Sequence, residues 1–262
     1  MASSRLSPSL VSELMGEGLL IAVVRGSRKS YRAQNVESLR RYLMDKDEEF
    51  RLLETSVRDN VSRASQAAST GNSKLLSVRS CPGFPVNAYE PIPCILNGHE
   101  MVVHPEEGSF LFVADWQAFS IPADVIVVGI ENMENFRMIR RQRALFCSTI
   151  GAHRLLFVSR YPQSTDLRSW LQTIPNRYIH FGDFDLAGIR IFLTEFHAYL
   201  PERSSFLISP DIEHRLAEGS AERYDDQYQY YKNFSSSIPE LQHLIDIIHK
   251  YHRCYDQEGY IV

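Results

Sequence analysis

Two aspartates that stand two positions apart have the clearest chemical potential in this sequence. The stretch YIHFGDFDLAGIRIF, residues 178–192, runs from an apolar strand pattern into Asp183 and Asp185 and then resumes an apolar helical pattern. Side chains alternate faces in an extended segment, so residues i and i+2 point the same way, with Cα atoms roughly 6.5 Å apart. Two like charges on one side are unfavourable unless a cation or water screens them. The pair therefore indicates a larger site.

A third carboxylate, Glu131, stands at the end of another apolar run. The run DVIVVGI, residues 124–130, has the continuous apolar character of a strand buried on both faces, and it leads directly into Glu131. In an open parallel sheet, chemistry lies beyond the carboxyl ends of the strands, where Glu131 would meet Asp183 and Asp185. Hard oxygen ligands of this kind suit Mg²⁺ or Mn²⁺, with water and a phosphate completing the coordination. We therefore predict a site there for one or two Mg²⁺ or Mn²⁺ ions.

The elements that must position these residues follow a regular pattern from residue 121 onward. Strand-like and helix-like segments alternate, and four strands joined by three helices predict a parallel sheet with right-handed crossovers. The predicted strands are 124–130, 154–159, 177–183 and 204–209. The tail is mainly helical, with an apolar stripe formed by Leu241, Leu244, Ile245 and Ile248.

The first 120 residues have a different organisation. Residues 8–15 predict a helix, a strand pair follows, and Asn35 is placed to cap a second helix. This order fits a small winged-helix-like unit, or equally any small α+β module with a solvated basic face. Residues 59–74 are small and polar, and Asn97-Gly98 predicts a hairpin between antiparallel strands. We divide the chain into a winged-helix-like region (1–58), a linker with antiparallel strands (59–120) and an α/β domain with a helical tail (121–262).

The acidic motifs resemble those of a known family. A strand that ends in Glu, and a later strand that ends in Asp-x-Asp before a small-residue turn and a helix, form the signature of the Toprim domain of topoisomerases, primases and several nucleases. The stretches VIVVGIENMENF and HFGDFDLAGIRIF are most similar to the Toprim domains of the topoisomerase VI A subunit and the Wadjet nuclease subunit JetD. The terminal DQEG is similar to an acidic element near the end of JetD-like chains. The resemblance covers residues 121–262.

The resemblance implies a fold, an activity and partners. The expected fold is α/β, a Toprim-type parallel sheet flanked by helices and preceded by a smaller winged-helix-like α+β region. Glu131, Asp183 and Asp185 would be catalytic residues and metal ligands, and Glu258 a further metal ligand. The expected activity is hydrolysis of double-stranded DNA by a metal-dependent endonuclease subunit. An SMC-like ATPase complex that acts against plasmids or phages is the implied partner, a homodimer is compatible with it, and the chain's lack of a Walker A motif leaves the motor to another chain.

DNA docking requires cations, because the acidic cluster by itself repels phosphates. The formal net charge is −4, yet residues 25–41 are locally basic, and a whole-chain sum hides that distribution. The predicted DNA-binding residues are Arg25, Arg28, Lys29, Arg32 and Arg160. The arginines of residues 137–143 are further candidates, although a solvated helix face is the simpler interpretation for each one.

Other interpretations of these residues stay open. An aspartate at a strand end often caps the next helix, which is the structural alternative for Asp185. Tyr31 lies among basic residues, where a topoisomerase-like strand cutter would carry its nucleophile, but it lacks the Tyr-Tyr pattern of those enzymes, so hydrolysis is preferred. A DNA-binding or assembly subunit that does not cut is the remaining alternative. His249, His252 and Cys254 lack the spacing of a zinc site, and we expect structural roles for them.

The composition describes an ordinary globular protein. Of its 262 residues, 44% are hydrophobic and 23% charged, which excludes fibrous and strongly disordered classes. No run approaches the length of a membrane span, and the first residues lack the basic flank and apolar core of a signal peptide. We therefore expect a cytoplasmic protein with no membrane partner, and we expect its four scattered cysteines to be reduced thiols.

Overall fold

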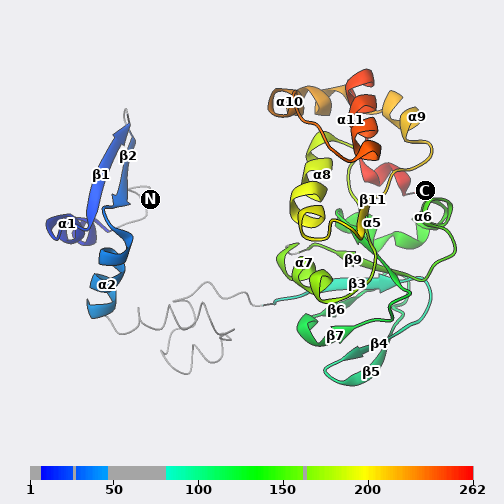
Figure 1. Cartoon of the computed structure of the whole chain (residues 1–262), viewed down its shortest axis with the longest axis horizontal. Helices are drawn as coiled ribbons and strands as arrows, with labels where there is room; N and C mark the ends of the chain where they lie inside the picture. The colour runs from blue at the N-terminus through cyan, green and yellow to red at the C-terminus, as the bar shows by residue number, and fades with distance from the viewer. Residues whose placement is uncertain (1–6, 26–27, 47–80, 162–163, 262) are drawn as a thin grey trace. The chain divides into compact units, whose positions relative to one another are not determined.

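The structure is a computed structural model that describes residues 7–25, 28–46, 81–161 and 164–261. The chain divides into two compact units, Met1–Ser80 and Cys81–Val262, and each is described by itself. Figure 1 draws the first unit in blue and the second from cyan to red.

The first unit has the order helix, strand, strand, helix. Ser7 caps the first helix by accepting a hydrogen bond from the Leu10 amide at 3.2 Å, and Asn35 caps the second by accepting one from the Ser38 amide at 3.0 Å. The two strands form an antiparallel hairpin. These elements confirm the predicted order, while their assignment to a winged helix stays a prediction. The elements are α1 (Pro8–Gly16), β1 (Leu20–Arg25), β2 (Arg28–Ala33) and α2 (Val36–Lys46).

The second unit is built on a six-stranded mixed sheet. Its strand order is β11-β10-β8-β9-β3-β6, in which the first four strands are parallel and the last two antiparallel. The parallel part confirms the four-stranded prediction. The strands are β3 (Phe84–Ala88), β6 (Leu111–Val113), β8 (Ile126–Ile130), β9 (Leu155–Ser159), β10 (Tyr178–Phe181) and β11 (Ser204–Phe206).

Residues 81–120, which the sequence groups with the linker, supply the antiparallel part of this sheet. β3 is fully buried and pairs with β9 on one side and β6 on the other. Three further strands form a small antiparallel sheet of order β5-β4-β7. These strands are β4 (Ile92–Leu96), β5 (His99–Val103) and β7 (Phe119–Ser120). The predicted Asn97-Gly98 turn joins β4 to β5 with φ values of 53° and 78°, which is the left-handed backbone of a type I′ hairpin.

Helices cover both faces of the large sheet. In the sheet, β9 lies on one side of β8, whereas β10 and β11 lie on the other side. With the right-handed crossovers that parallel strands favour, the helices between β8 and β9 lie on the opposite face of the sheet from those between β9 and β11. In Figure 1, α7 and α8 stand to the left and α6 to the right. The helices are α5 (Met133–Arg137), α6 (Arg143–Ile150), α7 (Ser164–Thr173), α8 (Leu186–Ile191), α9 (Ile212–Ala217), α10 (Ala221–Tyr231) and α11 (Pro239–Tyr251).

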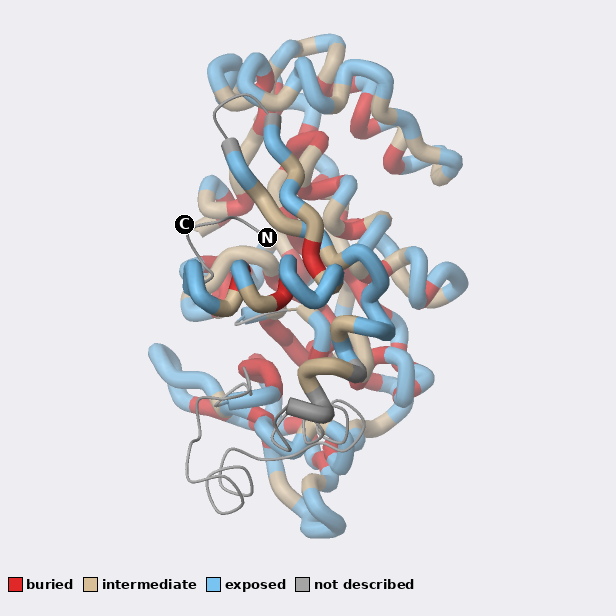
Figure 2. Tube along the Cα trace, turned by 90° about the vertical axis from the view of Figure 1, so that its left-hand side faces the viewer, coloured by how far each residue is buried: buried red, intermediate tan, exposed pale blue. Residues whose placement is uncertain are grey.

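The core of the second unit lies around the central strands. Every residue of β8, β9 and β10 is buried. Aromatic rings pack against one another in this core, for example Phe84 and Phe119 against Trp170. In the first unit, by contrast, exposed and intermediate residues prevail (Figure 2). Within the described residues, no helix is long and apolar enough to cross a membrane.

Candidate active site at the carboxyl edge of the sheet

Glu131 and the Gly-Asp-Phe-Asp segment leave the sheet side by side. β8 and β10 are parallel neighbours whose last residues, Ile130 and Phe181, are register partners. The Glu131 amide continues the ladder by donating to the Phe181 carbonyl at 3.1 Å. The sequence-predicted carboxylates of two distant segments therefore start from the same edge of the sheet.

Gly182 allows the Glu131 side chain to lie across the strand end. A Cβ atom at position 182 would lie 2.7 Å from Glu131 Oε2 and 3.0 Å from His180 Nε2, so a larger residue would make the Glu131 carboxylate shift. The glycine of the GDFD motif thus accommodates the Glu131 carboxylate where it lies. It does not relieve backbone strain, because its φ is not in the left-handed region.

The Glu131 carboxylate is mostly buried, beside Arg160 and His180, but is not fully hydrogen-bonded. Its side chain is 14% exposed, and Oε2 lies 3.6 Å from Nε2 of His180, while Oε1 lies 3.6 Å from Arg160 Nη2. The first distance is too long for a hydrogen bond, so Oε2 and Nε2 are buried polar atoms without a hydrogen-bond partner among the described residues. Such atoms in a native site call for an explanation, and an absent ligand is one.

The charges around Glu131 favour its ionised form. Burial acts to raise its pKa, but His180, Arg160 and Arg223 together outweigh this effect and hold the pKa below its ordinary value. The carboxylate is therefore anionic at neutral pH. His180 is itself 1% exposed, and its Nδ1 atom pairs with the Tyr178 hydroxyl at 2.9 Å. This contact aims Nε2 at Glu131.

Asp185 is an N-cap with all its oxygens engaged. Its Oδ1 accepts from the Gly188 amide at 2.6 Å at the start of α8, and its Oδ2 accepts from Arg223 Nε at 3.1 Å and from Gln227 Nε2 at 2.8 Å. A Cβ at position 188 would collide with the Asp183 carbonyl oxygen, so Gly188 lets the helix start close to the strand end. Asp185 is 2% exposed. Its contact with the Gly188 amide is that of a helix N-cap, which is the structural alternative to a metal ligand at this position.

Asp183 contacts both Arg223 of α10 and the C-terminal segment. Its Oδ2 accepts from Arg223 Nη2 at 2.7 Å, and its Oδ1 accepts from the Gln257 amide at 3.0 Å. Burial raises the pKa of Asp183, and the neighbouring Asp185 and Asp256 raise it further, against the lowering effects of the Gln257 amide and Arg223. With 22% of its side chain exposed, Asp183 is the more accessible member of the pair.

The C-terminal segment completes the site. Isolated antiparallel bridges join Cys254 to Ser220 and Tyr255 to Phe184, the residue between the two aspartates. The Gln257 side chain accepts from the Asn132 amide at 3.2 Å. Asn132 Nδ2 in turn donates to Oε1 of Glu258, whose Oε2 is buried without a hydrogen-bond partner among the described residues. The tail thus brings Glu258 against the residue that follows Glu131.

Several of these residues were not found by sequence reasoning. Arg223 sits in a stretch rich in acids and tyrosines, where it is the sole cation of α10, and this isolation was the available signal. Asn132 and Gln257 lie inside the motifs VIVVGIENMENF and DQEG, but they are uncharged, so a search for charged site residues does not select them. Asn135, whose Nδ2 donates to the Gln257 carbonyl at 2.7 Å, gave no signal.

The predicted DNA-binding residues are not gathered in one place. Arg160 is at the acidic site, where it also lies 3.5 Å from Glu195. Lys29 and Arg32 are exposed on β2 of the first unit, while the side chains of Arg25 and Arg28 lie outside the described residues. Tyr31 is a strand residue of β2 with the Lys29 ammonium 5.5 Å from its ring centre.

Two of the other candidate arginines, and the two histidines near the C-terminus, make structural contacts. Arg140 donates to the Pro105 carbonyl at 3.1 Å, and Arg143 pairs with Glu90 at 2.9 Å. His249 pairs with the Tyr224 hydroxyl at 2.8 Å, and His252 stacks on the same ring. The structural roles expected for the two histidines are consistent with these contacts.

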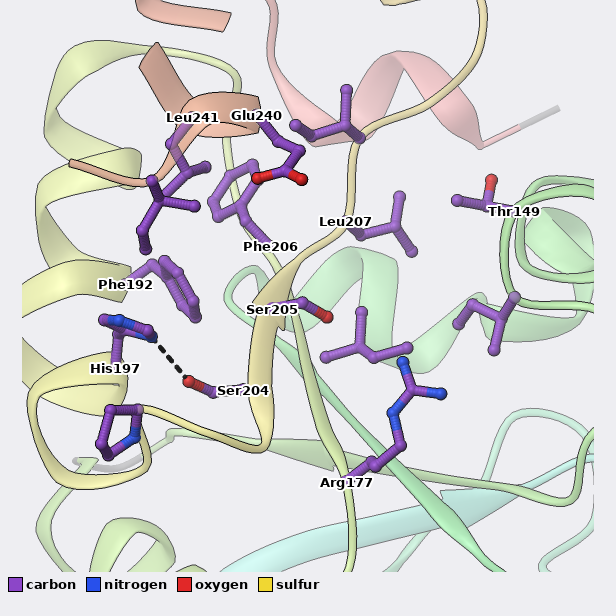
Figure 3. A pocket seen from close by; sticks show the side chains of 15 residues that line it. Thr149, Arg177, Phe192, His197, Ser204, Ser205, Phe206, Leu207, Glu240 and Leu241 are labelled. Carbon is purple, nitrogen blue, oxygen red and sulfur yellow. Dashed lines mark hydrogen bonds between the residues drawn. The ribbon is translucent and has the colours of Figure 1, made fainter. Parts of the chain in front are cut away.

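A pocket elsewhere in the second unit is separate from the acidic site. It has a volume of about 590 Å³ and is lined in part by the edge strand β11, with Arg177 and Glu240 among its other lining residues (Figure 3). In Figure 3 the His197 ring faces Ser204, and the two side chains are hydrogen-bonded at 3.0 Å. None of the four predicted metal ligands lines it.

The donor set fits a divalent cation in part. Carboxylates suit Mg²⁺ or Mn²⁺, and two buried carboxylate oxygens, on Glu131 and Glu258, lack hydrogen-bond partners within the described residues. Against this, no group of three acidic, histidine or cysteine side chains in the described part of the chain is arranged closely enough to hold a metal. Both oxygens of Asp185 and of Asp183 accept hydrogen bonds. The described residues therefore do not form a complete metal site, and among the predicted ligands Glu131 and Glu258 are the ones with a buried oxygen that lacks a partner within the described residues.

Comparison with known proteins gives a family but not an activity. A search of curated proteins found no match. A family model described as a domain of unknown function (DUF7281) matches residues 95–262, which include every described carboxylate of the acidic site. The chain belongs to this family.

Proposed function

We propose that this chain is a divalent-metal-dependent DNA endonuclease subunit of a Toprim-like, JetD-like type. The observation that carries the proposal is that Glu131 and the segment of Asp183 leave the sheet at the ends of adjacent parallel strands, with the Glu131 Oε2 atom buried and without a hydrogen-bond partner in the described part of the chain. The Toprim resemblance of the same two segments, stated above, supports it independently.

Glu131, Asp183 and Glu258 would hold the ion. A bound Mg²⁺ or Mn²⁺ supplies Lewis acidity toward a phosphodiester and lowers the pKa of water. Asp185, assigned to the metal from the sequence, is instead proposed to fix the start of α8 and the position of Arg223. Arg160, 32% exposed and within reach of Glu131, is the side chain placed to bind a phosphate oxygen at this edge.

The remaining parts of the proposal concern partners. Lys29 and Arg32 are exposed cations on β2, and we propose them, with Arg25 and Arg28, for docking to the DNA backbone. An SMC-like ATPase complex acting on plasmid or phage DNA is proposed from the resemblance, and a homodimer is compatible with it. An ATPase partner would supply the motor that this chain, with no Walker A motif, does not carry.

A non-cleaving DNA-binding or assembly subunit is the second candidate, and one observation favours it. The Arg223 guanidinium contacts Asp183 and Asp185 directly, so part of the acidic cluster is neutralised within the chain. A cluster with an internal counter-ion can be stable without metal. The two candidates differ in whether Asp183 is needed for a chemical step.

Incubation of the purified chain with supercoiled and linear DNA in Mg²⁺ or Mn²⁺ tests the proposal. Nicked or linear products with free ends are expected from the wild-type protein, and Asp183→Ala should abolish them while DNA affinity is retained. Asp225→Ala, an exposed acid on α10, is the matched control and should cut normally. DNA binding without cutting by the wild-type chain would favour the second candidate, and protein-linked ends that vanish in Tyr31→Phe would indicate transesterification.

A further inference from the structure

The strand β11 forms one edge of the large sheet, and only β10 pairs with it among the described residues. The Arg203 carbonyl accepts from the Tyr178 amide at 2.8 Å, and the Leu207 amide donates to the His180 carbonyl at 2.7 Å. Alternate residues of a strand turn their backbone groups to the same side. Because Arg203 and Leu207 face β10, the backbone groups of Phe206 face the open side of the sheet.

The open side of β11 has backbone groups that a further strand could bind. The Ser204 amide on that side donates to the Leu200 carbonyl at 3.1 Å. The Ser204 carbonyl and both backbone groups of Phe206 have no hydrogen-bond partner on that side within the described residues. Unpaired groups of this kind are what an extended peptide binds when it adds a strand to a sheet.

The pocket of Figure 3 lies along this edge and reaches both faces of the sheet. Phe192 and His197, which follow α8, line it on one face, and Thr149 in α6 lines it on the other. Most of the remaining lining is apolar, for example Phe206 and Leu241. An extended chain that pairs with β11 would place successive side chains on alternate faces, so it would fill both parts of the pocket.

A second pocket continues the first. It has a volume of about 360 Å³, shares Ile208 and Glu240 with the first, and is lined by further residues of α9 and α11. The two adjoining pockets thus follow the chain from β11 past Ile208. An elongated space of this kind suits an extended segment better than a compact small molecule.

Opposite charges stand at the two ends of β11. Arg177 precedes Tyr178, the register partner of Ser204 at the start of the strand, whereas Glu240 stands where the two pockets meet, in the first turn of α11. Figure 3 shows the two side chains at opposite ends of the strand. Both residues are exposed, and neither side chain forms an ion pair with a described residue. A segment with an acidic residue at one end and a basic residue at the other complements them.

We propose that the open edge of β11 binds an extended peptide segment of a partner protein as an additional strand, with an acidic residue beside Arg177 and a basic residue beside Glu240. Backbone hydrogen bonds to Ser204 and Phe206 supply affinity, and apolar side chains in the pocket supply specificity. This interaction is independent of the proposed nuclease activity, because none of the predicted metal ligands lines either pocket.

Two capped, fluorescein-labelled peptides of opposite order, Glu-Val-Thr-Val-Thr-Val-Lys and Lys-Val-Thr-Val-Thr-Val-Glu, are the probes, and fluorescence anisotropy with the full chain measures binding. At least one should bind, because the direction of the added strand decides which one has its acid beside Arg177. Arg177→Glu should weaken that binding by about tenfold or more, since it places like charges together. Arg141→Glu, at an exposed arginine outside both pockets, is the matched control and should leave binding unchanged.

N-methylation of the bound peptide tests the backbone pairing. Alternate residues of an added strand direct their amides to β11, and the intervening residues direct theirs to solvent. Methyl groups on one alternating set of amides should therefore abolish binding, and methyl groups on the other set should leave it unchanged. Equal effects of the two sets would overturn the added strand.

The remaining outcomes also decide. No binding by either peptide, or binding that Arg177→Glu does not weaken, rejects the inference. A wild-type chain that sediments as a dimer and becomes monomeric in Arg177→Glu also rejects it, because a second copy then occupies the edge. Circular dichroism checks folding, and if Arg177→Glu does not fold, Glu240→Lys replaces it with the same expected loss. DNA cleavage is measured separately, so each of these results leaves the proposed function standing.

Discussion

The two halves of the acidic site contain the same kind of side chain in opposite situations. On the Glu131 half, buried oxygens of Glu131 and Glu258 lack hydrogen-bond partners within the described residues. On the Asp185 half, both oxygens of the carboxylate accept hydrogen bonds from the Gly188 amide, Arg223 and Gln227. Since an unsatisfied buried polar group costs about 1–3 kcal/mol, the first half carries a deficit that the second does not.

This difference indicates which carboxylates stabilise the fold and which have oxygens available to bind a ligand. Asp185 ties the N-terminus of α8 to α10 and is expected to matter most for stability. Glu131 touches no helix cap and is expected to matter most for binding. Asp183 belongs to both halves, because it shares Arg223 with Asp185 and is joined through Gln257 to the tail that carries Glu258.

The largest effect on stability is expected from Asp185→Ala. The substitution removes a helix cap and leaves Gln227 and one nitrogen of Arg223 without their buried acceptor, at a cost of about 2–4 kcal/mol. Urea unfolding of the metal-free protein measures it. Glu131→Gln, in the same assay at neutral pH, should lower stability by clearly less. Equal losses in the two variants would break the distinction between the halves.

A smaller effect is expected in the pH dependence of stability. The pKa of Glu131 is lowered in the folded chain, so its stabilising contribution is present above the unfolded pKa and lost as the pH falls through the folded pKa. The pKa of Asp183 is raised, so its contribution is present below the unfolded pKa and lost as the pH rises through the folded pKa.

Two isosteric variants measure these opposite signs. In EDTA, from acidic to neutral pH, Glu131→Gln should become less stable relative to wild type, and Asp183→Asn should become more stable relative to wild type. Urea midpoints at a series of pH values give both slopes. Slopes of the same sign for the two variants would show that the electrostatic contrast between the halves is wrong.

Local sequence patterns predicted the positions of Glu131 and Asp183, because each residue follows a buried strand. The apolar runs before Glu131 and Asp183 are buried strands whose ends meet, because strands buried on both faces have a composition that is visible in sequence. The Asn97-Gly98 hairpin was likewise predictable, since its positive φ values favour those residue types.

Long-range pairing could not be predicted in the same way. β3 contains Pro85 and Asn87, which suggest a turn, yet the strand is buried between β9 and β6. Asn87 is tolerated there because its Nδ2 donates to the Ser109 carbonyl at 3.1 Å. Arg223 and Gln257 reach Asp183 across 40 and 74 residues of sequence. Such contacts depend on how α10 and the tail pack, and no local periodicity encodes that.

A crystal soaked in Mn²⁺ and measured for anomalous scattering tests the central claim most directly. We predict anomalous density at the carboxyl edge of β8 and β10, within coordination distance of the Glu131 carboxylate and shared with Asp183 or Glu258. A soaked crystal with no peak at that edge, or with its peak away from Glu131, would contradict the account.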